Sequence, residues 1–182
     1  KMMFGLKDSL EKDTFLACVE GLENCMKKDE YGLFPLFVDL TEKQAVVIGA
    51  GKIASRRIET LTKFTPHILV IADRAEEKVL EMAKQGMIKL QIRKYQREDL
   101  YGADLVIAGT DDEALNNEIY SVCKCLGILV NVISDRRKCD FQFPGIVKRD
   151  RLVIGINAGG NNHRLARETR EQIDKMMGGE NT

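Results

Sequence analysis

The sequence has few of the residues on which metal sites and disulfide scaffolds depend. Its 182 residues include two histidines and an odd number of cysteines, five. The cysteine spacings match no zinc or redox motif, since Cys123 and Cys125 lack the two-residue gap of a CxxC pair. No apolar run approaches the roughly 18 residues that a membrane helix needs. We therefore expect reduced thiols, no bound metal and no membrane partner.

Net charge is also absent, because 28 basic side chains balance 28 acidic ones. The balance is not local: residues 131–170 carry nine basic and four acidic side chains, a charge of +5, and the remainder is at −5. This asymmetry indicates either an anionic ligand near the later segment or a solvated basic face. We expect no nucleic-acid partner. No signal peptide is recognisable in the charged N-terminal residues, so we expect a cytoplasmic protein.

Strand-like runs alternate with helix-like runs between residues 44 and 134. The expected strands are 44–50, 67–73, 88–94, 103–112 and 128–134, and the expected helices are 52–64, 75–86 and 113–127. Such alternation is typical of parallel strands joined by crossover helices, and the strands' continuous apolar character fits burial on both faces. We predict an α/β, Rossmann-like, doubly wound parallel sheet with ligands at the carboxyl ends of its strands.

The flanking segments have other rhythms. Residues 8–28 show the 3.6-residue period of an amphipathic helix. Residues 141–157 hold two strand-like runs around a charged turn, which predicts a β-hairpin, and a last helix is expected over 162–177. We divide the chain into an N-terminal helical extension (1–33), a nucleotide-binding domain (34–140), a strand segment for dimerisation (141–160) and a short C-terminal helix (161–182).

A glycine-rich turn, GAGKIA, joins the first expected strand to the first expected helix at residues 49–54. In that context Gly49 permits the tight turn, Gly51 lets the backbone approach a pyrophosphate, and Ala54 lets helix and sheet pack closely. Asp73 ends the second expected strand and can accept hydrogen bonds from the adenosine ribose hydroxyls. This predicts NAD rather than NADP, although the neighbouring Arg74 could tolerate a 2′-phosphate.

Further polar residues follow the fourth strand and precede the last helix. Thr110, Asp111 and Asp112 would lie over the cofactor, and Asp111 or Asp112 would also suit the N-cap of the next helix. His163 is interpreted as a cap of the last helix rather than as a metal contact.

Four stretches occur in one order: FPLFVDLTEKQAVVIGAGKIASRRIETL, GTDDEALN, NVISDRRKCDFQFPGIV and INAGG…LAR. Together they resemble the precorrin-2 dehydrogenase family, the dehydrogenase module of siroheme synthase, over roughly residues 34–170. The resemblance implies NAD-dependent oxidation of precorrin-2 to sirohydrochlorin. It also implies a homodimer built partly on the strand segment and, in some members, insertion of ferrous iron.

The resemblance assigns residues as well. It implies that Lys52, Ile53, Asp73 and Arg74 bind the cofactor. The family's key acid follows the fifth strand in a pattern similar to NVVDD, where this chain has Ser134 and then Asp135. Asp135 is the nearest surviving carboxylate and the first catalytic candidate, and Asp140 is the second. The carboxylates of the tetrapyrrole would be gripped by basic side chains, for which the candidates are Arg136, Arg137, Lys138, Arg149 and Arg164.

The sequence departs from the family pattern in three places: at Ser134, at GGNNH (159–163) where the family often has GG-x-SP, and in its short C-terminal region. Two other interpretations therefore stay open. One is a non-catalytic NAD-sensing module, which would share the glycine turn but has no need of CDFQFP or a basic hairpin. The other is a Rossmann relative that has lost its chemistry.

Overall fold

The computed structural model describes residues 33–159 and 162–178, so the helix predicted over 8–28 lies outside the described residues. Contacts divide the described chain into two compact units. The larger unit is Phe37–Gly145, and the described residues of the smaller one are 33–36, 146–159 and 162–178. No helix in these residues is both long enough and apolar enough to cross a membrane.

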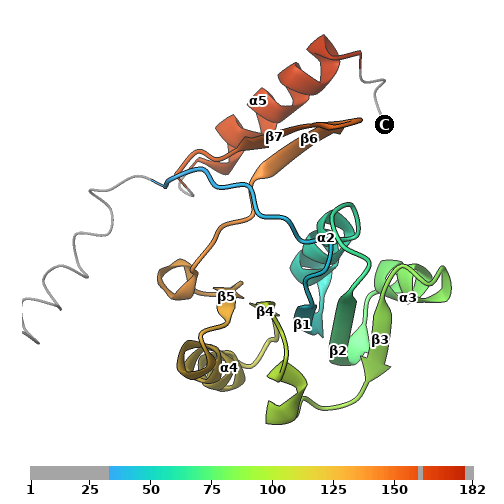
Figure 1. The fold of residues 1–182 in the computed structure, drawn as a ribbon, viewed down its shortest axis with the longest axis vertical. Coiled ribbons are helices and arrows are strands. Elements are labelled where there is room, and N and C mark those ends of the chain that lie inside the picture. Colours follow the sequence, from blue (N-terminus) through green and yellow to red (C-terminus); the bar gives the residue numbers. More distant parts are fainter. Residues whose placement is uncertain (1–32, 160–161, 179–182) are drawn as a thin grey trace, which may run out of the picture. The chain divides into compact units, whose positions relative to one another are not determined.

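The larger unit contains a five-stranded parallel sheet in the order β3-β2-β1-β4-β5 (Figure 1). The strands are β1 (Ala45–Ala50), β2 (Ile68–Ala75), β3 (Lys89–Ile92), β4 (Leu105–Ala108) and β5 (Leu129–Val132). The connections hold α2 (Lys52–Leu61), α3 (Glu77–Lys84), η2 (Arg97–Leu100) and α4 (Glu113–Leu126), and η3 (Arg136–Lys138) follows β5. Strand order reverses between β1 and β4. The predicted doubly wound α/β fold is confirmed, and its switch point lies at the end of β1.

Both faces of the sheet are apolar because alternate residues of each strand enter different cores. In β1, Val47 packs with Ile58 of α2 and with α3 on one face. Its neighbour Ile48 packs with Ile119 of α4 on the other face. The continuous apolar run of β1 therefore reflects burial on two sides, and it leaves polar chemistry to the strand ends.

One predicted helix face is wrong in part. The helical spacing of its apolar residues predicts that Ile53, Ile58 and Leu61 share one buried face of α2, but Ile53 is 54% exposed. The buried face instead runs through Ala54, Ile58 and Leu61, which follow the i, i+4, i+7 spacing of one helix side. Ile53 lies in the first turn, at the edge of the sheet where ligands bind.

The smaller unit holds a two-stranded hairpin, β6 (Gly145–Arg149) and β7 (Leu152–Ile156), and the helix α5 (His163–Met176). Asp150 turns the chain with a left-handed φ of 49°. An ion pair from Arg149 Nη2 to Asp174 Oδ1, 2.5 Å long, joins β6 to α5. The hairpin is confirmed, although its first strand begins at Gly145 and not at Phe141.

Phe141 and Phe143 explain that later start. Both side chains pack against the core of the larger unit, with ring centroids 5.8 Å apart. The aromatic pair is therefore partly buried against the sheet unit and does not belong to the strand pairing of the hairpin.

Candidate functional site

The glycine turn is fixed by backbone contact between two strand ends. Gly49 has a left-handed φ of 99°, and a Cβ there would lie 2.3 Å from the carbonyl oxygen of Gly109 at the end of β4. The Gly109 N–H in turn donates to the carbonyl oxygen of Ile48 over 2.8 Å. Only glycine satisfies both the conformation and the space at position 49.

Gly51 stands in the opposite situation. Its φ is −76°, which any residue adopts, and a Cβ at this position would meet nothing within 4 Å. The fold itself therefore does not require glycine at 51, and the position leaves open space directly before α2. That space fits the close approach of a ligand to the backbone.

The N-terminus of α2 has features that favour the binding of an anion. Gly51 supplies no side-chain cap, and the first turn contains no acidic residue. By contrast, Asp112 caps α4 by accepting from the Leu115 N–H over 3.1 Å. The amide groups of α2 are thus left to an external acceptor, as in helix N-termini that bind phosphate. Together with the space at Gly51, they fit a dinucleotide pyrophosphate.

Asp73 and Arg74 lie in an irregular part of β2. Ile71 pairs with Ile48 and Ala75 with Ala50, so three residues of β2 face Gly49 alone. Such a bulge re-aims side chains next to a site. The second strand was expected to end at Asp73 but continues to Ala75, and both Asp73 and Arg74 are exposed within the bulge.

Some of the residues after β4 stabilise the fold, and one is left exposed at the candidate site. Thr110 donates from Oγ1 to Asn116 Oδ1 over 2.8 Å, and Asn116 is 1% exposed. Asp112 is the N-cap of α4, as one of the two predicted alternatives had it. Asp111 is left exposed, and its carboxylate accepts from the Arg74 guanidinium at 3.0 Å. Asn116 was missed because a buried asparagine in a helix has no motif of its own.

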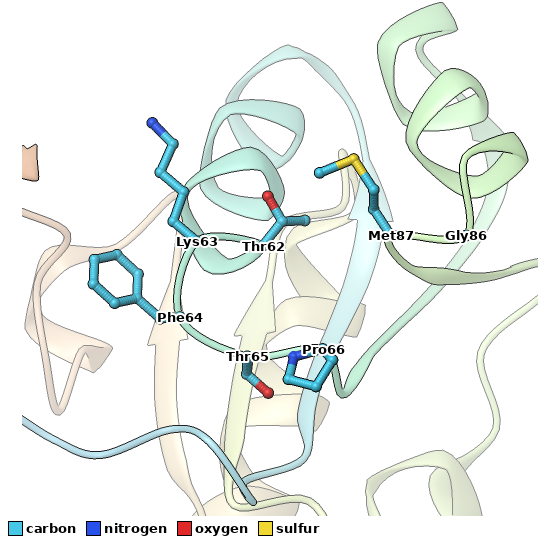
Figure 2. Close-up of a pocket in the computed structure, with 7 residues that line it drawn as sticks. All are labelled: Thr62, Lys63, Phe64, Thr65, Pro66, Gly86 and Met87. Atoms are coloured by element: carbon cyan, nitrogen blue, oxygen red, sulfur yellow. The ribbon is translucent and has the colours of Figure 1, made fainter. Parts of the chain in front are cut away.

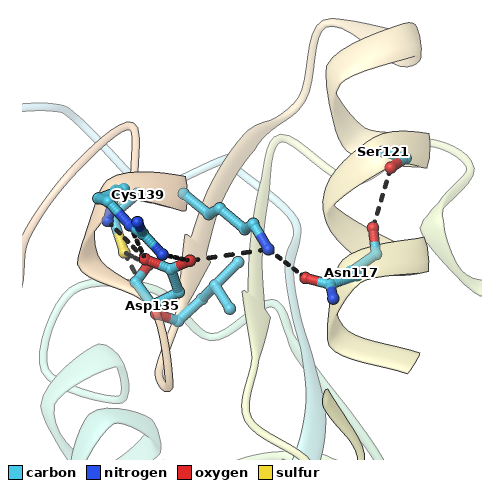
Figure 3. A network of polar contacts seen from close by, with 7 residues as sticks. Asn117, Ser121, Asp135 and Cys139 are labelled. Atoms are coloured by element: carbon cyan, nitrogen blue, oxygen red, sulfur yellow. Dashed lines mark hydrogen bonds and ion pairs between the residues drawn. The ribbon is translucent and has the colours of Figure 1, made fainter. Parts of the chain in front are cut away.

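Asp135 lies in the turn after β5 and is bound by cations, as Figure 3 shows. It accepts from Arg137 Nε at 3.1 Å and from the Arg137 amide at 3.0 Å, and Lys138 Nζ lies 3.6 Å away. Lys138 also donates to Asn117 of α4. The pKa of Asp135 is held below its ordinary value of 3.8, and the hydrogen bonds from Arg137 are the main cause. Partial burial opposes this effect. Asp135 is therefore an anion at neutral pH.

Asp140 lies at the other end of β5. Its carboxylate accepts from Lys124 Nζ at 2.8 Å and from the Val130 amide at 3.1 Å, near the start of the strand. The structure thus brings Asp135, Asp111 and Asp73 to the carboxyl edge of the sheet. It places Asp140 in a clamp between α4 and β5.

A half-buried arginine that the sequence analysis missed supports this region. Arg57 of α2 donates to the side chain of Asn131 in β5, and its guanidinium lies 5.1 Å from the centre of the Phe143 ring. Asn131 donates onward to the Phe141 carbonyl oxygen over 2.7 Å. Burial lowers the pKa of Arg57. These contacts hold the chain after Asp135 against the sheet unit.

The remaining predicted residues lie in two different units. Arg136 belongs to η3, beside Arg137 and Lys138. Arg164 lies in α5, in the smaller unit, with its Nε 3.8 Å from Glu168. The prediction that His163 caps α5 is wrong, since Asn162 accepts from the Leu165 N–H and His163 is the first helical residue. Among the described residues, no three His, Cys, Asp or Glu side chains gather as a metal site would require.

Comparison with known proteins agrees with this geometry. A family described as putative NAD(P)-binding matches residues 36–145. The chain belongs to this NAD(P)-binding family. The matched range covers the whole parallel sheet together with the glycine turn, Asp73, Asp111 and Asp135.

Two proteins that are similar in sequence have names that refer to siroheme. Siroheme synthase of Psychrobacter sp. (strain PRwf-1) is 36% identical over 144 residues, which are 79% of this chain and 30% of that protein. A probable multifunctional siroheme biosynthesis protein HemA of Ruminiclostridium josui is 37% identical over 147 residues, 80% of this chain and 28% of that protein. The chain thus spans about 30% of the length of these relatives.

A solved structure has the same fold. SirC, a precorrin-2 dehydrogenase, superposes with a TM-score of 0.72 at 25% identity, covering 79% of this chain and 70% of that one. The resemblance that the sequence motifs indicated is confirmed.

A pocket of about 350 Å³ lies elsewhere in the NAD(P)-binding unit (Figure 2). Its walls are the 62–66 and 86–87 loops, which lead into β2 and β3 at their amino ends. It is therefore at the edge opposite to the glycine turn, and none of the predicted site residues is among its lining residues.

The two glycines of the turn predict opposite phenotypes. Gly49→Ala should lower the free energy of unfolding by about 2–4 kcal/mol, because it adds left-handed strain and a clash with backbone. Gly51→Ala should change it by less than about 1 kcal/mol but weaken nucleotide binding, since the methyl group fills the open space. Urea unfolding followed by circular dichroism, with NADH titration, measures both quantities. Equal stability losses in the two variants would contradict this interpretation.

Proposed function

We propose that the protein catalyses the NAD-dependent oxidation of precorrin-2 to sirohydrochlorin, in siroheme biosynthesis. The observation that carries the proposal is the carboxyl edge of the sheet, where an open glycine turn, an acidic residue in the bulge of β2 and a carboxylate after β5 occur together. The names of the relatives, siroheme synthase and precorrin-2 dehydrogenase, support the choice of substrate.

In this proposal the cofactor is held by the residues around the end of β1. The amides of α2 and the open space at Gly51 receive the pyrophosphate, with Lys52 and Ile53 exposed beside it. Asp73 accepts from the adenosine ribose hydroxyls, which favours NAD. Bound NAD supplies the hydride acceptor, and the protein orients it and manages the accompanying proton.

The substrate is an anion, and the turn after β5 is rich in cations. Arg136, Arg137 and Lys138 follow Asp135 directly, and all three belong to one turn of 3₁₀ helix. Guanidinium groups bind carboxylates through paired hydrogen bonds. We assign these three residues to the substrate's carboxylates. Arg164 belongs to the other unit, and its role in substrate binding stays a prediction from the family resemblance.

Asp135 is the proposed proton acceptor, because it is the carboxylate that ends at the ligand edge after β5. Its cations keep it ionised, so it is ready to accept a proton but is a weak base. A substrate carboxylate that draws Arg137 away would strengthen it as a base. Substrate binding and base activation would then be coupled through one arginine.

One observation favours the non-catalytic alternative. The Asp135 carboxylate already has two cationic partners, and the preceding position is Ser134 where the family pattern has an acid. An NAD-binding module without turnover would keep the glycine turn and need no free base. Incubation with NAD and precorrin-2, followed by absorption spectroscopy, separates the two: sirohydrochlorin formation supports the enzyme, and NAD binding without it supports the module.

The two candidate carboxylates should respond differently to amidation. Asp135→Asn should lower turnover by about 10²–10⁴, the usual contribution of a general base, with little effect on NAD affinity. Asp140→Asn is the matched control: it should keep turnover but cost about 1 kcal/mol of stability, because it weakens the clamp on Lys124 and Val130. Steady-state rates and urea unfolding measure both. A loss of less than threefold for Asp135→Asn would remove it from this role.

The pH dependence of kcat/KM should reflect the effect of the neighbouring cations on the pKa of Asp135. Since its pKa is lowered, the carboxylate stays ionised until the pH falls below 3.8, so it adds no acid limb between about pH 5 and 8. Arg137→Gln removes the side-chain hydrogen bonds, the largest cause of the lowered pKa, and leaves the bond from the amide of residue 137, the charge of Lys138 and the opposing burial. The acid limb of kcat/KM should then move to higher pH. Identical profiles for both proteins would count against Asp135 as the titrating base.

We also propose a homodimer that uses the hairpin. Val147 is the one fully buried apolar residue among the described residues of the smaller unit, and α5 buries none. A two-stranded hairpin with such a small core is marginal alone and has two open edges.

Light scattering at micromolar concentration should therefore give twice the mass of the chain. Leu152→Lys in β7 should shift the protein toward monomer. Leu126→Lys, the same change at an exposed leucine of α4, should not. A monomeric unmutated protein would refute the proposal.

A further inference from the structure

The carboxyl edge contains one ion pair that the proposed chemistry does not use. Arg74 of the β2 bulge and Asp111 of the turn after β4 meet at 3.0 Å, with side chains 89% and 93% exposed. Because β2 and β4 flank β1 in the sheet, the pair joins the two sides of the strand that ends in the glycine turn.

Arg74 is the side chain that would otherwise favour NADP. In folds of this kind an arginine beside the ribose acid can accommodate the 2′-phosphate of NADP, while the acid itself selects the free hydroxyl of NAD. Here the acid is Asp73 and the arginine follows it directly in the same bulge. The preference for NAD therefore depends on what holds the Arg74 guanidinium.

Asp111 is well placed to hold it. The residues on both sides are fixed by their own bonds: Thr110 to Asn116, and Asp112 to the first turn of α4. The backbone of Asp111 is thus anchored, and its side chain is left to reach Arg74. An exposed ion pair is weak by itself, so this contact can set a preference without strongly stabilising the fold.

We propose that Asp111 is a specificity-determining positioning residue: it engages Arg74 and so denies NADP the guanidinium that would neutralise its 2′-phosphate. The inference rests on the proposed nucleotide site, but not on the identity of the second substrate. In this proposal Asp111 does more than lie near the cofactor: it contributes to the preference for NAD over NADP.

The test compares AMP with 2′,5′-ADP, two probes that differ only by the 2′-phosphate, using calorimetric titration. The measured quantity is the ratio of their dissociation constants, in which any general damage to the site cancels. In Asp111→Asn the ratio of the 2′,5′-ADP constant to the AMP constant should fall about fivefold, the upper end of what an exposed ion pair contributes. The gain should shrink in 0.5 M salt.

Two further variants separate this mechanism from simple charge removal. Asp112→Asn removes the same charge one residue away and keeps a good helix cap, so it should move the ratio by less than threefold. In Arg74→Gln/Asp111→Asn the fivefold gain should vanish, because the released guanidinium is missing. Asp111→Glu should keep the unmutated ratio.

An unchanged ratio in Asp111→Asn would overturn the proposal. So would an equal gain in Asp112→Asn, or a gain that survives in the double variant. If the unmutated protein binds AMP but does not oxidise precorrin-2, the activity proposed above fails while the ratios still decide this inference. If it binds neither probe, both fail together.

Discussion

The approach of Gly49 to Gly109 is the constraint on which the site depends. A side chain at position 49 would overlap the carbonyl of Gly109, so the ends of β1 and β4 are in direct backbone contact. Gly109 is itself crowded by Ile133, which follows β5, since a Cβ there would lie 2.5 Å from Ile133 Cδ1. Three strand ends are thereby fixed against one another at the switch point, where a doubly wound sheet binds its ligands.

Close packing at the strand ends has a chemical consequence, because it leaves little room for polar side chains between them. The carboxylates therefore lie around the packed glycines rather than among them: Asp73 in the bulge of β2, Asp111 beyond β4 and Asp135 beyond β5. Each comes from a different strand but shares one edge. A rigid backbone contact at the centre and adaptable charges at the rim suit a site that must hold a dinucleotide and a second anionic molecule.

Much of this could be predicted because it depends on local pattern. The apolar runs predicted the five strands, and GAGKIA between strand and helix predicted the turn at Gly49 and Gly51. The interactions that were missed join residues distant in sequence, such as Arg57 with Asn131 and Arg74 with Asp111. Periodicity reports which residues are buried, but it does not report strand register, and the bulge that carries Asp73 is a register shift. Ile53 shows the same limit on a helix, where one apolar residue of the first turn lies beyond the core.

The ion pairs of this edge explain how acidic residues can line a site for anions. Asp111 is balanced by Arg74, and Asp135 by Arg137 and Lys138, so neither carboxylate repels an incoming phosphate or carboxylate with its full charge. Asp73 is different: it is exposed, and within the described part of the chain no ion pair neutralises it. Once a bound ligand displaces water from it, such a carboxylate is costly unless it meets hydrogen-bond donors. Ribose hydroxyls are such donors and a 2′-phosphate is not, so the same charge that would hinder a general anion site selects the nucleotide.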